Sequence, residues 1–67
     1  MNENIINANG KFVRHNGKTF RVLSCRLGSK VLADAENVQS GERINLMKSR
    51  SADCLAVRHA IDQGLLS

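Results

Sequence analysis

The dipeptide Asn16-Gly17 is the feature that most constrains the fold of this chain. It stands between two β-prone runs, 11–15 and 18–23. Asn and Gly both accept the positive φ that the two central positions of a type I′ turn require. The sequence therefore predicts an antiparallel hairpin closed by a two-residue loop.

The loop length also decides which side chains share a face of the hairpin. With two loop residues, His15 opposes Lys18 and Val13 opposes Phe20. One face then carries Val13, Phe20 and Val22, and the other carries Arg14, Thr19 and Arg21 with Phe12 and Leu23 at its far end. A three-residue loop with a glycine bulge would shift this register, and the sequence is consistent with either loop length. In either case we expect both phenylalanines to be needed inside the fold.

The rest of the chain predicts further strands and then a helix. Gly28-Ser29 separates the hairpin from a third strand at 30–36, and a turn at 37–41 precedes an alternating run at 42–48. From Ser51 the period becomes helical, and the apolar residues that recur on one side are Cys54, Val57, Ala60, Ile61 and Leu65. Ser49 or Ser51 can cap this helix, and Gly64 can end it.

These elements predict an α+β fold, namely a small antiparallel β-barrel or meander of four to five strands followed by one C-terminal α-helix. A chain of 67 residues has room for one small domain, which we place at 10–67. Residues 1–9 are expected to be an N-terminal tail or a short edge strand. Because so small a core gives limited stability, a homodimer is a further possibility.

Positive charge is concentrated in the first half of the sequence. Up to Ala33 there are six basic residues and only Glu3 as an acid, a net +5, whereas the remainder carries −1. The six basic residues are Lys11, Arg14, Lys18, Arg21, Arg26 and Lys30. We expect their charged ends to lie together on one side of the domain, where they would attract a polyanion.

Residue patterns that carry catalytic chemistry are not recognisable in the sequence. Cys25, Cys54, His15 and His59 are too widely separated for a compact metal site, and the cysteines are interpreted as buried small hydrophobic residues. There is no glycine-rich phosphate loop and no nucleophile motif. We therefore expect a protein that is not an enzyme, uses no cofactor or metal and is cytoplasmic, because neither a membrane span nor a signal peptide is visible.

The segment from Gly17 to Lys48 resembles a known small barrel. The strings Gly-Lys-Thr-Phe-Arg-Val-Leu, Lys-Val-Leu-Ala-Asp-Ala-Glu and Gly-Glu-Arg-Ile-Asn-Leu are similar to the Src-homology-3-like barrel at the C-terminal end of Mu-type transposase cores. The final strand lacks the aromatic residue usual in that family. The resemblance implies a barrel used as a binding accessory that contacts nucleic acid or another protein. We therefore expect a regulatory or accessory protein of a phage or mobile element.

Two functions follow as hypotheses. The first is a module that binds DNA or RNA phosphates through the six basic residues of the N-terminal half, with little sequence specificity. The second is a protein-interaction module or inhibitor that docks the same basic hairpin on an acidic partner surface. Residues 57–64 also faintly resemble the recognition helix of small repressors, but no preceding helix and turn is visible.

Overall fold

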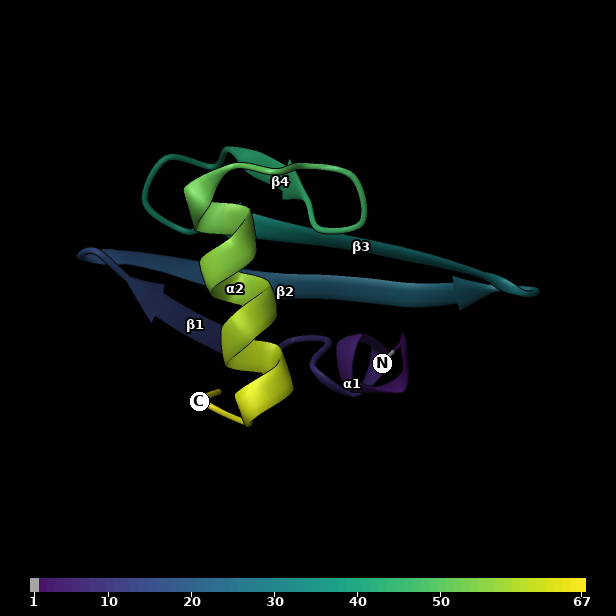
Figure 1. The fold of residues 1–67 in the computed structure, drawn as a ribbon. Helices are drawn as coiled ribbons and strands as arrows, with labels where there is room; N and C mark the ends of the chain where they lie inside the picture. Colours follow the sequence, from purple (N-terminus) through teal and green to yellow (C-terminus); the bar gives the residue numbers. More distant parts are fainter. Residues whose placement is uncertain (1) are drawn as a thin grey trace.

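The computed structural model describes residues 2–67 of the chain, with side chains from Glu3 onward. The elements are α1 (Asn2–Asn7), β1 (Phe12–His15), β2 (Lys18–Leu27), β3 (Lys30–Asn37), β4 (Arg43–Asn45) and α2 (Ala52–Gln63). Four antiparallel strands are thus followed by a C-terminal helix, which confirms the predicted α+β class (Figure 1).

The first hairpin has the two-residue loop that Asn16-Gly17 predicts. Asn16 has a φ of 51° and Gly17 a φ of 74°, as a type I′ turn requires. Val13 faces Phe20 and His15 faces Lys18, so the register for this loop is confirmed and the bulged alternative is not adopted.

The strands form an open meander rather than a closed barrel. Their order is β1-β2-β3-β4, each antiparallel to the next, and β1 and β4 are the two edges. Such a sheet is compatible with a small Src-homology-3-like barrel, but closure does not occur. β4 is only three residues long, because the Asn45 side chain accepts bonds from the amides of Met47 and Lys48 and turns the chain away. On the opposite edge, the C-terminal Ser67 exchanges backbone hydrogen bonds with Phe12.

Both helices pack on one face of the sheet, where the core lies. In Figure 1, α2 crosses the sheet, and α1 lies beside the projecting half of β2. The core is built from small and medium apolar side chains: Ile5, Ala8, Val13, Phe20, Val22, Val31, Ala33, Ala35, Leu46, Cys54, Val57, Ala60 and Ile61. Two expectations are wrong here. Leu65 is exposed because the helix ends before it, and Cys25 is exposed because it lies on the uncovered face of β2.

The N-terminal segment is a helix, α1, and neither a tail nor an edge strand as predicted. Ile5 and Ala8 are buried against the sheet. The Ser24 hydroxyl of β2 donates to the Ile5 carbonyl at 2.7 Å, and the Asn9 side chain accepts from the Ser24 amide at 2.9 Å. A helix this short is marginal in isolation, so its stability depends on these contacts with β2.

The ends of α2 are those that the sequence predicts. The Ser51 side chain accepts a hydrogen bond from the Cys54 amide, and Gly64 adopts a left-handed conformation with a φ of 71°. Among residues 2–67, no helix is both long enough and apolar enough to cross a membrane.

Candidate nucleic-acid interface

The sheet has one face that no helix covers, which we call the open face. Side chains alternate between the two faces of a strand, so the residues that lie between the core residues along each strand point to the open face. They are Phe12 and Arg14 of β1, the odd-numbered residues from Thr19 to Leu27 of β2, Lys30, Leu32, Asp34 and Glu36 of β3, and Arg43 and Asn45 of β4. None of these residues is buried.

Three arginines and a phenylalanine lie at one end of the open face. Phe12, Arg21, Glu36 and Arg43 are cross-strand neighbours in a single row, and Arg14 is two residues beyond Phe12 on β1. The Arg21 guanidinium lies 5.4 Å from the centroid of the Phe12 ring, within the range of a cation–π contact. We call Phe12, Arg14, Arg21 and Arg43 the arginine cluster.

Glu36 is the acid within this row, between Arg21 and Arg43. Within the described residues, no ion pair joins Glu36 to either arginine, since the salt bridges involve other groups. The guanidinium groups of the cluster are therefore available to an anion from solution.

Lys18 belongs to the other face and has a structural partner. Its Nζ donates to Asp53 Oδ2 at 3.0 Å, and Asp53 Oδ1 lies 3.8 Å from His15 Nε2. Asp53 is in the first turn of α2, where a carboxylate is also favoured by the helix dipole. Lys18 and His15 thus attach the turn end of the first hairpin to the N-terminus of α2.

Arg26 also points to the helix side of the sheet and pairs with Glu3 of α1. Lys30 is on the open face, but it lies next to the Gly28-Ser29 turn of the second hairpin, which is formed by β2 and β3. At about 3.3 Å per residue, it lies about 20 Å from Arg21. Lys11 is exposed directly before β1. The expectation that all six basic residues share one side is therefore wrong, because strand alternation and two ion pairs divide them.

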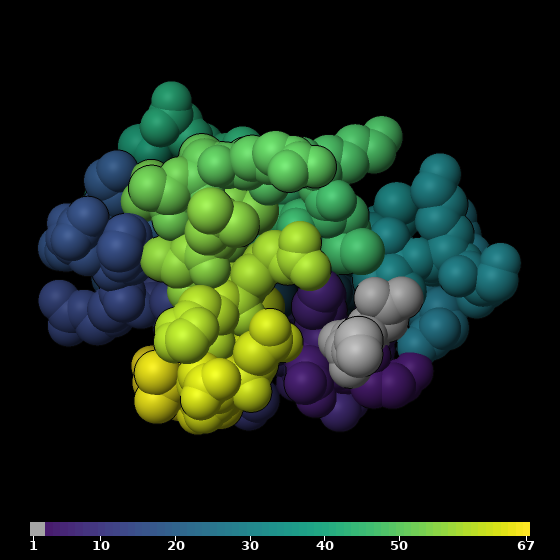
Figure 2. Space-filling model, in the orientation of Figure 1, coloured from purple at the N-terminus to yellow at the C-terminus, as the bar shows by residue number. Residues whose placement is uncertain are grey.

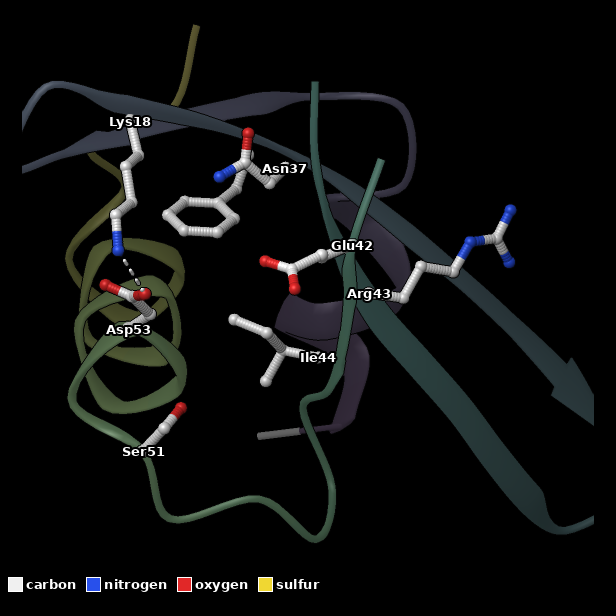
Figure 3. A pocket seen from close by; sticks show the side chains of 8 residues that line it. Lys18, Asn37, Glu42, Arg43, Ile44, Ser51 and Asp53 are labelled. Carbon is white, nitrogen blue, oxygen red and sulfur yellow. Dashed lines mark hydrogen bonds and ion pairs between the residues drawn. The ribbon is translucent and has the colours of Figure 1, made fainter. Parts of the chain in front are cut away.

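A pocket of about 290 Å³ lies between the N-terminus of α2 and β4. Figure 3 shows Lys18 bonded to Asp53 on one wall, while Glu42 and Ile44 point into the space and Arg43 points away from it. Two carboxylates therefore face the pocket against one amine. This balance disfavours an anionic ligand, so the pocket is not a continuation of the arginine cluster.

Two members of the cluster were not among the predicted binding residues. Arg43 lies in the half of the chain with no net positive charge, and only the β3–β4 pairing places it in the same row as Arg21, on the other side of Glu36. Phe12 was expected inside the fold, whereas its ring is half-buried on the open face. The predicted register already placed Phe12 beside the arginines, and this was the available signal.

A scan against known protein families found no match, and comparisons with curated proteins and with solved structures found none either.

Proposed function

We propose that the protein is a small nucleic-acid-binding module that holds a single strand on the open face of its sheet. The observation that carries the proposal is the arginine cluster, which lies along one end of an uncovered sheet. Arg21 lies over the half-buried Phe12 ring, and Arg14 and Arg43 flank this pair on β1 and β4. In the part of the chain that the structure describes, none of the three guanidinium groups forms an ion pair. Four-stranded sheets bind single-stranded RNA in this way, with aromatic residues stacking on bases and basic residues contacting phosphates.

The roles within the cluster follow from the chemistry of each group. Arg14, Arg21 and Arg43 provide forked donors for phosphate oxygens. The Phe12 ring is the one aromatic surface of the cluster, and the Arg21 guanidinium lies over it, so a base would stack beside or on this pair. With a single aromatic residue, binding is dominated by phosphate contacts and depends weakly on sequence. The resemblance to the transposase barrel supports a role as an accessory in the handling of nucleic acid.

The test is a fluorescence titration of labelled oligothymidine and of a duplex at several salt concentrations. Wild-type affinity should be strongest at about 50 mM salt and should fall as salt increases. The Arg14→Gln/Arg21→Gln variant should lose two phosphate contacts, which lowers the slope of log K against log salt by about 1.4 for a single strand. If the wild-type protein does not bind at about 50 mM salt, the proposal is wrong.

A matched control separates local contacts from net charge. Arg50→Gln/Arg58→Gln removes the same two charges, but from the loop before α2 and from α2 itself. This variant should keep the wild-type slope. Equal losses in both variants would show that only the overall charge matters and would contradict the assignment to the open face.

Docking of an acidic protein is the second candidate function. The observation that favours it is the presence of Leu27 and Leu32, which are 66 % and 42 % exposed, on the same face as the arginines. Pull-down from a host extract, with Arg14→Glu/Arg21→Glu as the control, tests this candidate. A partner retained equally by both proteins would show that the charge of the hairpin is irrelevant.

A further inference from the structure

The β3 strand has a stretch of uncovered edge near the end of the second hairpin. β4 pairs with residues 34–36 of β3, and the Leu46 amide donates to the Ala33 carbonyl at 2.9 Å. Because backbone groups alternate sides in an antiparallel strand, the N–H and C=O of Val31 point to this same edge. Within residues 2–67, no backbone group bonds to Val31 on that side.

A groove follows this uncovered edge. It has a volume of about 410 Å³ and is lined by residues 30–34 of β3 and by Asn45, Met47 and Lys48 after β4. Figure 2 shows the end of the second hairpin, in teal, projecting beyond the body of the domain and separated from the green segment that follows β4. The groove therefore combines unpaired backbone groups with exposed apolar side chains, Leu32 and Met47.

We propose that this groove binds an extended, acidic peptide segment of a partner protein by adding it as a strand to β3. Strand addition takes its affinity from main-chain hydrogen bonds and its specificity from alternate side chains. The uncovered edge from Ser29 to Leu32 accommodates about four residues, about 13 Å of strand. The added strand cannot extend beyond Leu32, because the carbonyl of Ala33 already accepts a hydrogen bond from the Leu46 amide.

The charges of the groove select an acidic occupant. Lys30 and Lys48 line it against Asp34 alone, and Asp34 lies where β4 already covers the edge. A carboxylate opposite Lys30 would thus meet positive charge, and an apolar side chain two residues away would meet Leu32. This site uses the edge of the sheet and does not depend on the arginine cluster.

A second copy of the chain is the less favourable occupant. Two β3 edges paired about Val31 would bring Lys30 and Lys48 of both copies to one junction, where like charges repel. In this register Lys30 would face Leu32 of the other copy rather than an acid. Asp34 could not compensate, because β4 blocks its edge in each copy.

The probe is the peptide acetyl-Leu-Val-Glu-Val-Leu-amide, which presents the same pattern in either strand direction. In ¹⁵N-correlated NMR titrations, the largest shifts should fall on the amides of Val31, Ala33 and Met47. Binding should be at least tenfold weaker when Lys replaces the central Glu of the peptide. It should also be lost when alternate backbone nitrogens of the peptide are methylated, because these N–H groups would bond to β3.

The charge-reversed protein Lys30→Glu/Lys48→Glu provides the matched control, since both residues are exposed. It should bind the peptide with a central Lys in preference to that with Glu. Shifts located elsewhere, no binding at about 1 mM, or equal binding of the methylated peptide would overturn the proposal. The proposal would also be overturned if the free protein sedimented as a dimer in which the Val31 amide is protected from hydrogen exchange, because the occupant of the groove would then be a second copy.

Discussion

The ion pair between Lys18 and Asp53 allows a direct test of whether a basic residue of the first hairpin is structural or binds phosphate. The side chains are 48 % and 25 % exposed, and the bond is 3.0 Å long. Partly exposed pairs of this kind contribute about 0.2–1 kcal/mol. Lys18→Met keeps the alkyl stem and should destabilise the domain by that amount. Asp53→Asn should cost more, about 0.5–2 kcal/mol, because it also removes a charge that favours the helix N-terminus.

The double-mutant cycle isolates the pair from these other effects. Urea unfolding of the two single variants and the double variant at pH 7 and low salt should give a coupling energy of about 0.5 kcal/mol. For a domain of this size, that corresponds to about 2–4 °C in melting temperature. The coupling should shrink in 1 M NaCl, where charges are screened within about 3 Å. Zero coupling at low salt would refute the structural role.

The same Lys18→Met protein should be titrated with oligothymidine. Because Lys18 is bound to Asp53 on the helix side of the sheet, the slope of log K against log salt should remain that of the wild type. A decrease of about 0.7, the value of one phosphate contact, would show that Lys18 leaves Asp53 and contacts nucleic acid.

Three further predictions concern stability. Leu46→Ala removes a fully buried side chain and should cost about 2–5 kcal/mol, which calorimetry would detect as a large loss of melting temperature. Gly17→Ala places a Cβ at a φ of 74° and should cost about 1–2 kcal/mol, whereas Asn16→Gly, measured alongside by urea unfolding, should be tolerated. Ser51→Ala removes the acceptor of the Cys54 amide and should cost about 0.5–2 kcal/mol, with a matching loss of helical circular dichroism on warming.

Local chemistry made the first hairpin and α2 predictable. Asn16 and Gly17 determine the turn, and the turn determines the register through His15 and Lys18. In α2, capping by Ser51 and termination at Gly64 depend on residues within the helix or adjacent to it. Such signals require no knowledge of the tertiary fold.

The features that were missed depend on contacts between distant segments. The helix α1 has few local signals and is held by Ser24 of β2, nineteen residues after Ile5. The sheet remains open because Asn45 ends β4 early and because Ser67 occupies the outer edge of β1 at Phe12. Arg43 joins the arginine cluster only through the β3–β4 register. No pattern within a short window could have indicated these pairings.

The division of the basic residues changes the expected strength of nucleic-acid binding. Six cations on one face would give a salt slope of about −4 for a single strand, at about 0.7 per phosphate. Only Arg14, Arg21 and Arg43, with Lys11 at the margin, remain near one another and without an acidic partner in the part of the chain that the structure describes. The expected slope is therefore about −2 to −3. A slope near −4 that Lys30→Gln does not lower would require Lys18 and Arg26 to leave Asp53 and Glu3, and this would contradict the assignment of those residues to the helix side of the sheet.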